Sequence, residues 1–160
     1  MVKYILEKTF ASNGRELTHI SSIELSNNMA ISLPDKATSY IEMKDRIVVL
    51  ILFPTQCLPE KEEDIYRNIF CYSKTDGSLL WQIEHYDVDG EIIEDVFVGM
   101  SVLINKEEKN EEWYTTTLNK EIKAPSFVPE RDSFTLGTFE GCRYELDPLT
   151  GKIKFIIKSK

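Results

Sequence analysis

The sequence lacks the features that mark membrane-spanning, secreted and metal-binding chains. Its longest aliphatic run, Ile47 to Phe53, has seven residues, whereas a helix needs about twenty to cross a bilayer. No apolar run typical of a signal peptide opens the sequence, and neither end carries a lipidation signal. The three cysteines contain no C-x-x-C pair, which excludes a zinc ribbon and a thioredoxin-type redox pair. We therefore expect a cytoplasmic protein with no membrane segment, no metal and no other cofactor.

Basic residues and chain breakers are also scarce. Nineteen Lys and Arg stand against 27 Asp and Glu, a net charge of −8, and an acidic surface repels nucleic-acid phosphates. Seven glycines and six prolines are too few for a collagen or a low-complexity linker. What remains is an ordinary globular composition, with 42% hydrophobic residues in 160, enough to bury one core without disulfides. We expect one domain over residues 1–160 and no nucleic-acid partner.

The dominant hydrophobic period is two, which is typical of β-strands. Residues 152–158 alternate lysines with Ile153, Phe155 and Ile157, which predicts a strand with these three side chains on its buried face. Residues 47–53 are apolar on both faces, which indicates a central strand that ends before Pro54. Further strands are predicted at residues 3–10, 17–25, 29–33, 40–43, 68–73, 78–84, 91–104 (with a bulge at Gly99), 113–118, 133–139 and 142–146. With no long amphipathic helix in sight, this pattern predicts an all-β fold, an antiparallel β-sandwich or distorted barrel.

Asp76-Gly77, which lies between two apolar runs, predicts a β-hairpin, because both central residues of such a turn must tolerate positive φ. With a two-residue turn, Tyr72 faces Trp81 across the hairpin. Phe70 then faces Ile83 in the same way. We therefore predict that Trp81 is buried in the sheet against Tyr72.

A weak internal repeat relates residues of about 45–84 to residues of about 132–157. Three positions match between the copies: Tyr72 and Tyr144, Gly77 and Gly151, and Trp81 and Phe155. This strand–turn–strand plan resembles the blade repeats of quinoprotein-type β-propellers. A propeller needs about four or more blades, so we interpret the similarity as shared hairpin chemistry and expect no quinone cofactor.

A closer resemblance covers most of the chain from about residue 30 onward. Its most specific parts are Trp81-Gln82-Ile83 and the turn Asp147-Pro148-Leu149-Thr150-Gly151-Lys152. These elements look like those of a group of small bacterial all-β proteins that have no assigned activity or catalytic residue. The resemblance implies an all-β fold of bacterial type, and small proteins of this style suggest toxin neutralisation by analogy.

Candidate catalytic and metal-binding residues are few. Of the two histidines, His19 and His85, only His85 lies among carboxylates that could support a general base. No nucleophile motif stands near it, and an exposed strand-end histidine is the favoured interpretation. Residues 87–91 are acidic enough for calcium, but their spacing misses the EF-hand pattern, which favours a solvated turn. Cys71 and Cys142 lack the setting of an activated thiolate and are expected to be structural.

Acidic side chains concentrate in one part of the sequence. Residues 60–112 hold 15 acidic and 5 basic side chains, whereas the rest of the chain holds 12 acidic and 14 basic ones. A field of one sign steers a partner of the opposite sign, although surface acid also keeps a small protein soluble. We predict a non-catalytic binding protein, immunity- or antitoxin-like, that presents an acidic face to a basic protein partner. The expected partner-binding residues are Glu84, Asp87, Asp89, Glu107, Glu108, Glu111, Glu112 and Trp113.

The alternative, from another class, is a small-ligand-binding or enzymatic barrel with a site lined by Trp113, His85 and nearby acids. A pocket that holds a bound metabolite would favour this alternative. A solid core with a flat acidic face favours the binding protein. The acidic loops need not lie together, and the partner, the oligomeric state and the strand order are open at this point.

Overall fold

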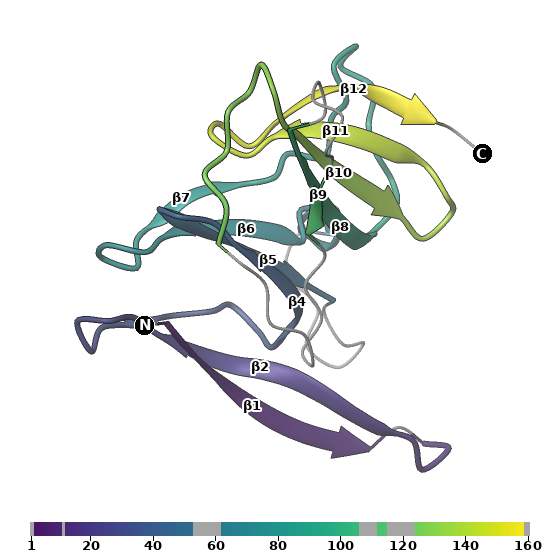
Figure 1. The fold of residues 1–160 in the computed structure, drawn as a ribbon. Helices are drawn as coiled ribbons and strands as arrows, with labels where there is room; N and C mark the ends of the chain where they lie inside the picture. The colour runs from purple at the N-terminus through teal and green to yellow at the C-terminus, as the bar shows by residue number, and fades with distance from the viewer. Residues whose placement is uncertain (1, 11, 53–61, 106–111, 115–123, 159–160) are drawn as a thin grey trace.

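The computed structural model describes residues 2–10, 12–52, 62–105, 112–114 and 124–158 of the chain (Figure 1). These residues form two antiparallel sheets, and neither sheet closes into a barrel. The first sheet has the order β1-β2-β4-β5-β6-β7, with β3 paired to β2, and the second has the order β12-β11-β10-β8-β9. The predicted all-β fold is therefore confirmed, in its sandwich-like form.

The strand bounds follow the period-two pattern closely. A short 3-10 turn, η2, spans Glu62–Ile65. The strands are β1 (Lys3–Phe10), β2 (Glu16–Glu24), β3 (Ala30–Ile31), β4 (Ala37–Glu42), β5 (Arg46–Ile51), β6 (Ile69–Ser73), β7 (Leu79–Gln82), β8 (Phe97–Ile104), β9 (Glu112–Tyr114), β10 (Ser133–Thr138), β11 (Arg143–Asp147) and β12 (Lys152–Lys158). Of the predicted strand at 91–104, only the part from Phe97 onward is a strand, with a register shift beside Gly99. Of the predicted strand at 113–118, residues 115–118 lie outside the described residues.

The apolar strand β5 lies between two layers, which explains why both of its faces are hydrophobic. Val48 and Leu50 join the core between the two sheets. Ile47, Val49 and Ile51 point the other way, into a second core that β2 and β3 cover. Figure 1 shows the β1–β2 hairpin on one side of β4–β7 and the strands β8–β12 on the other. The predicted central strand is confirmed, and burial on both faces is its physical cause.

The β6–β7 hairpin forms where predicted, but its register differs from the prediction by one residue at Phe70 and by two residues at Tyr72. Trp81 pairs with Cys71, and Tyr72 pairs with Leu79 across a register shift. A slip of one residue turns a side chain to the other face of the sheet. Trp81 is buried as predicted, at 9% exposure, but it lies in the inter-sheet core with Cys71, while Phe70 and Tyr72 lie in the second core. The predicted pairings of Trp81 with Tyr72 and of Ile83 with Phe70 are therefore wrong.

The last strand is an edge strand, and its predicted buried face is wrong in part. Ile153 packs against the inter-sheet core, but Phe155 is 47% and Ile157 is 44% exposed. Two register shifts against β11 leave Lys154 and Ile157 without a paired residue. These bulges break the simple alternation that the sequence indicates.

In the part of the chain that the structure describes, no helix is long and apolar enough to cross a membrane.

Candidate functional site

The acidic hairpin, defined here as residues 84–95, is the site that the fold positions most clearly. A bridge between Tyr86 and Ile92 closes it, and the Asp87 N–H donates to the carbonyl of Glu91 over 2.9 Å. The Asp87 side chain holds the turn, because its Oδ1 accepts from the backbone N–H groups of Asp89 at 2.9 Å and Glu91 at 3.0 Å. Gly90 supplies the positive φ of 79° that the turn requires.

Both ends of the acidic hairpin are tied to the body of the protein. The Ile93 N–H donates to the carbonyl of His85 over 2.6 Å. Asp95 Oδ2 accepts from the backbone N–H of Glu140 at 2.9 Å, which fixes it to the β10–β11 turn. Just beyond, the buried Asn68 side chain donates to the carbonyl of Phe97 over 2.8 Å and accepts from the Phe97 N–H over 3.2 Å. The loop is therefore held on a rigid frame.

The acidic hairpin carries six carboxylates and no Lys or Arg within its twelve residues. One of the six, Glu84, pairs with Arg67 at 3.0 Å. The negative field reaches the neighbouring strand β11. Burial raises the pKa of Tyr144 to about 12, with smaller contributions from Cys142 and then from the charges of Asp87 and Asp95. This segment is therefore a concentrated source of negative potential.

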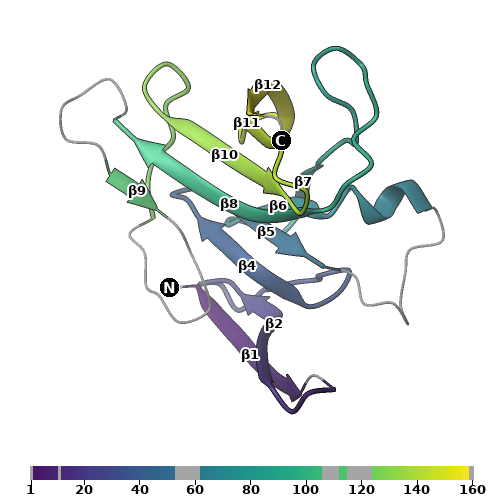
Figure 2. The same ribbon diagram turned by 90° about the vertical axis from the view of Figure 1, so that its right-hand side faces the viewer.

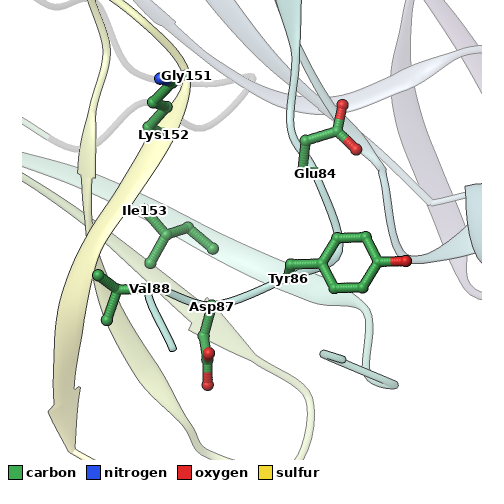
Figure 3. A pocket seen from close by; sticks show the side chains of 7 residues that line it. All are labelled: Glu84, Tyr86, Asp87, Val88, Gly151, Lys152 and Ile153. Atoms are coloured by element: carbon green, nitrogen blue, oxygen red, sulfur yellow. The ribbon is translucent and has the colours of Figure 1, made fainter. Parts of the chain in front are cut away.

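A recess of ≈ 290 Å³ lies between the acidic hairpin and the start of β12. In Figure 3 one wall comes from the β11–β12 turn and β12, and the other comes from the first residues of the hairpin. Its lining residues are Glu84, Tyr86, Asp87, Val88, Gly151, Lys152 and Ile153.

Exposed apolar side chains alternate with acidic ones along the acidic hairpin. Tyr86 is 45% exposed, and Val88 and Ile92 are each 57% exposed. Exposed aromatic and aliphatic side chains beside polar ones are a common feature of protein-binding surfaces. The arrangement therefore offers contact area as well as charge.

The structure brings together only some of the predicted partner-binding residues. Glu84 and Asp87 line the recess, and Asp89 belongs to the tip of the same hairpin. Glu112 and Trp113 lie on β9, which is the far edge of the second sheet from β12. Three strands separate the two edges, which is about 19 Å at a strand spacing of about 4.8 Å. Figure 2 shows this separation. Glu107, Glu108 and Glu111 lie outside the described residues.

His85 is buried, contrary to the exposed position expected for it. Its exposure is 6%, and its ring lies 4.3 Å from that of Tyr86. The period-two pattern continues past the end of β7, so Ile83 and His85 point inward while Glu84 and Tyr86 point outward. The alternative site needs His85 beside Trp113, and the structure places β9 at the opposite edge of the second sheet from the recess next to His85.

The other candidate residues have structural settings. No group of three or more His, Cys, Asp or Glu side chains among the described residues is arranged to hold a metal ion. Burial raises the pKa of the Cys71 thiol to about 12, against a smaller opposing effect of Arg46, so this thiol is poorly suited to act as a thiolate. Cys142 is partly buried against the inter-sheet core. Cys57 lies outside the described residues.

Sequence reasoning missed Tyr86, Val88, Lys152 and Ile153 as lining residues of the recess. The sequence does show Tyr86 and Val88 as apolar side chains inside an acidic turn, which is the signal that could have identified them. The last two come from a strand more than sixty residues further along the chain, and no local pattern indicates that it lies beside the hairpin.

Comparisons with protein-family models, with curated proteins and with solved structures find no match to this chain. The resemblances noted from the sequence therefore stay predictions.

Proposed function

We propose that this chain is a non-catalytic binding protein, immunity- or antitoxin-like, whose acidic hairpin captures a basic protein partner. One observation carries the proposal: six carboxylates with no Lys or Arg lie on a hairpin that hydrogen bonds tie to the body of the protein, beside an open recess. Complementary charge of this kind accelerates encounter and rejects acidic competitors. Of the acidic region at residues 60–112, we therefore propose residues 84–95 and the other residues that line the recess as the partner-binding part.

The recess suits a lysine or arginine side chain of the partner. Val88 and Ile153 offer an apolar wall for the aliphatic stem, and Glu84 and Asp87 offer carboxylates for the charged head. The exposed ring of Tyr86 supplies a further favourable surface for a cation. Lys152, which also lines the recess, limits the positive charge that the recess can accept. The recess therefore favours one basic side chain of the partner over a cluster of basic side chains.

The test compares two variants that have the same change in net charge. In the hairpin variant, Glu84→Gln, Asp89→Asn and Glu94→Gln are combined. The control combines Glu16→Gln, Glu24→Gln and Glu130→Gln, which are exposed residues elsewhere. The wild-type chain is used to capture a partner from its source cells, and association kinetics are then followed over a salt series.

We expect the hairpin variant to associate about tenfold more slowly than the wild type at low salt. The control should stay within about twofold, because its charges do not line the recess and are exposed to screening by salt. A captured partner that is acidic would contradict the proposal. An association rate that ignores both salt and the hairpin substitutions would contradict it equally.

A further inference from the structure

Among the described strands, the two sheet orders end in four edge strands, namely β1 and β7 in the first sheet and β9 and β12 in the second, and the two-residue β3 is a side branch on β2. An edge strand carries a row of unpaired N–H and C=O groups that can pair with another chain. The four edges differ in length, regularity and charge. These differences decide which one can accept a further strand.

Three of these edge strands are poorly suited to pairing with a further strand. β7 has four residues and a register shift, and its Trp81 indole donates to the carbonyl of Pro148 over 2.8 Å, so the β11–β12 turn lies over it. β9 has three residues. β12 is longer, but it carries two bulges and three lysines, the devices by which proteins discourage strand addition.

The remaining edge, β1, is eight residues long and regular. Its pairing with β2 shifts register once, but the extra residue is Ser21 on β2, so the alternation along β1 is intact. Ser21 Oγ donates to the carbonyl of Ile5 over 3.1 Å, so this carbonyl faces β2. The backbone groups of Tyr4 and Leu6 therefore face away from β2, because successive residues of a strand point to opposite sides.

We propose that β1 is a homodimerisation edge, which pairs antiparallel with β1 of a second copy in a register centred on Ile5. In this register Lys3 of each copy lies opposite Glu7 of the other, and Tyr4 lies opposite Leu6. The two-fold symmetry makes each of these pairs occur twice. Lys3 and Glu7 are both exposed at present, so the charge complementarity is available without rearrangement.

Neighbouring registers are worse. Centring on Glu7 or Lys8 sets a like charge opposite itself, which is destabilising across strands. Centring on Leu6 produces no opposite-charge pair. Among the registers compared, only the one centred on Ile5 sets an acidic residue opposite a basic one. In this register β1 is complementary to itself, which favours a second copy of this chain over an unrelated strand.

Burial and preorganisation support the same register. Leu6 is 49% exposed in the single chain, and the Tyr4 side chain of the second copy would lie beside it. Tyr4 is already fixed, because its hydroxyl donates to Glu42 over 2.7 Å and its ring stacks on Tyr40 at 4.0 Å. Glu7 now pairs with Lys36 at 2.6 Å and would gain Lys3 of the second copy as another neighbour.

Dimerisation at β1 is independent of the proposed function. Figure 1 shows β1 at one end of the molecule and β12, whose first residues line the recess, at the other. A dimer through β1 therefore leaves both acidic hairpins open to a partner.

The test is sedimentation velocity on the full chain over about a hundredfold range of concentration around the micromolar level. We expect a concentration-dependent dimer. Glu7→Lys should weaken it at least about tenfold, because two opposite-charge pairs become two like-charge pairs. The charge swap Lys3→Glu with Glu7→Lys should restore it, although neither variant keeps the pair with Lys36. Glu130→Lys is the matched control, because Glu130 is an exposed acid that lies on neither β1 nor β2, and it should leave the dimer unchanged.

Hydrogen exchange gives a second readout. The amides of Tyr4 and Leu6 should become protected as the concentration rises, because they would then donate to the second copy. A chain that stays monomeric throughout would overturn the proposal. So would a dimer that survives Glu7→Lys, a charge swap that fails to restore pairing, or a control that weakens the dimer as much as Glu7→Lys does.

Discussion

The β6–β7 and β11–β12 hairpins follow one sequence plan, yet they use its last aromatic residue in opposite ways. Tyr72 and Tyr144 are buried to a similar degree in both copies, but Trp81 is 9% exposed whereas Phe155 is 47% exposed. The difference comes from what lies over each strand. The turn of the second hairpin covers Trp81, with the Pro148 carbonyl accepting from its indole at 2.8 Å. A repeated pattern thus indicates a hairpin, but not which side chains another element will cover.

The largest expected difference is between Trp81→Ala and Phe155→Ala. Removing Trp81 deletes a core aromatic side chain and its hydrogen bond, and should lower the free energy of unfolding by about 3–5 kcal/mol. Removing the half-exposed Phe155 should cost less than about 1 kcal/mol. Denaturant unfolding of both variants measures the two losses. Equal losses would show that the two aromatic positions are equivalent after all.

The turn glycines sharpen the comparison. A Cβ on Gly151, whose φ is 78°, would lie 2.5 Å from the ring of Trp81. Gly151→Ala should therefore cost about 2–4 kcal/mol, from left-handed backbone strain and overpacking together. Gly90 has the same kind of φ, at 79°, with nothing within 4 Å of its Cβ position.

Gly90→Ala is thus the matched control. It should lower the free energy of unfolding by the left-handed backbone strain alone, about 1 kcal/mol. In a Trp81→Ala background the cost of Gly151→Ala should fall toward that of the control, because the colliding ring is gone. Thermal or denaturant unfolding of the four variants reports this coupling. Additive losses would mean that the contact between Gly151 and Trp81 does not shape the turn.

Arg46 is the next expected contributor, because it ties the second turn to the first sheet. Its Nη1 donates to the carbonyls of Pro148 at 3.1 Å and Leu149 at 3.4 Å, and its side chain is largely buried. Arg46→Ala should lower the free energy of unfolding by about 2 kcal/mol, as expected for a charged donor to backbone carbonyls, one of them on the buried residue Pro148. Lys36→Ala, which removes an exposed ion pair, should cost less than about 1 kcal/mol in the same assay.

The smallest effect concerns the first turn and its pH dependence. Hydrogen bonds from the Ser78 side chain and backbone lower the pKa of Asp76. Since the ionised form is the one that the turn stabilises, this contribution is present above the ordinary aspartate pKa and disappears as the pH falls through the lowered value. An NMR titration should place the Asp76 midpoint below that of an ordinary aspartate. Ser78→Ala should move it upward, and an unmoved midpoint would exclude the hydroxyl as the main cause.

Much of the secondary structure was readable from residues close together in the chain. The strand at residues 3–10, the central strand beginning near Ile47 and the turn at residues 147–151 all appear where the period and the turn residues indicate. Register was harder, because the bulge in the β6–β7 hairpin moves Trp81 to the face of Cys71. A bulge depends on packing against other strands, and the local sequence of the hairpin does not predict it.

The candidate site was predictable only in part for a similar reason. The acids of residues 84–95 were visible as charge, and Glu84 and Asp87 do line the recess. Glu112 and Trp113 lie on a different edge of the sheet, because β8, β10 and β11 separate β9 from β12. Strand order within a sheet is set by long-range pairing.

By itself, the sequence determined the all-β class, the positions of the turns, the burial of both faces of β5 and the location of the negative charge. Each of these depends on side chains within a few residues of one another, through the two-residue period and the conformational freedom of glycine. Only the tertiary structure decided that Trp81 is covered and Phe155 is not, that β12 is blunted while β1 is a regular edge, and that Lys152 and Ile153 face the acidic hairpin. These outcomes depend on which distant strands pair and in what register, and that choice is made by packing two cores at once.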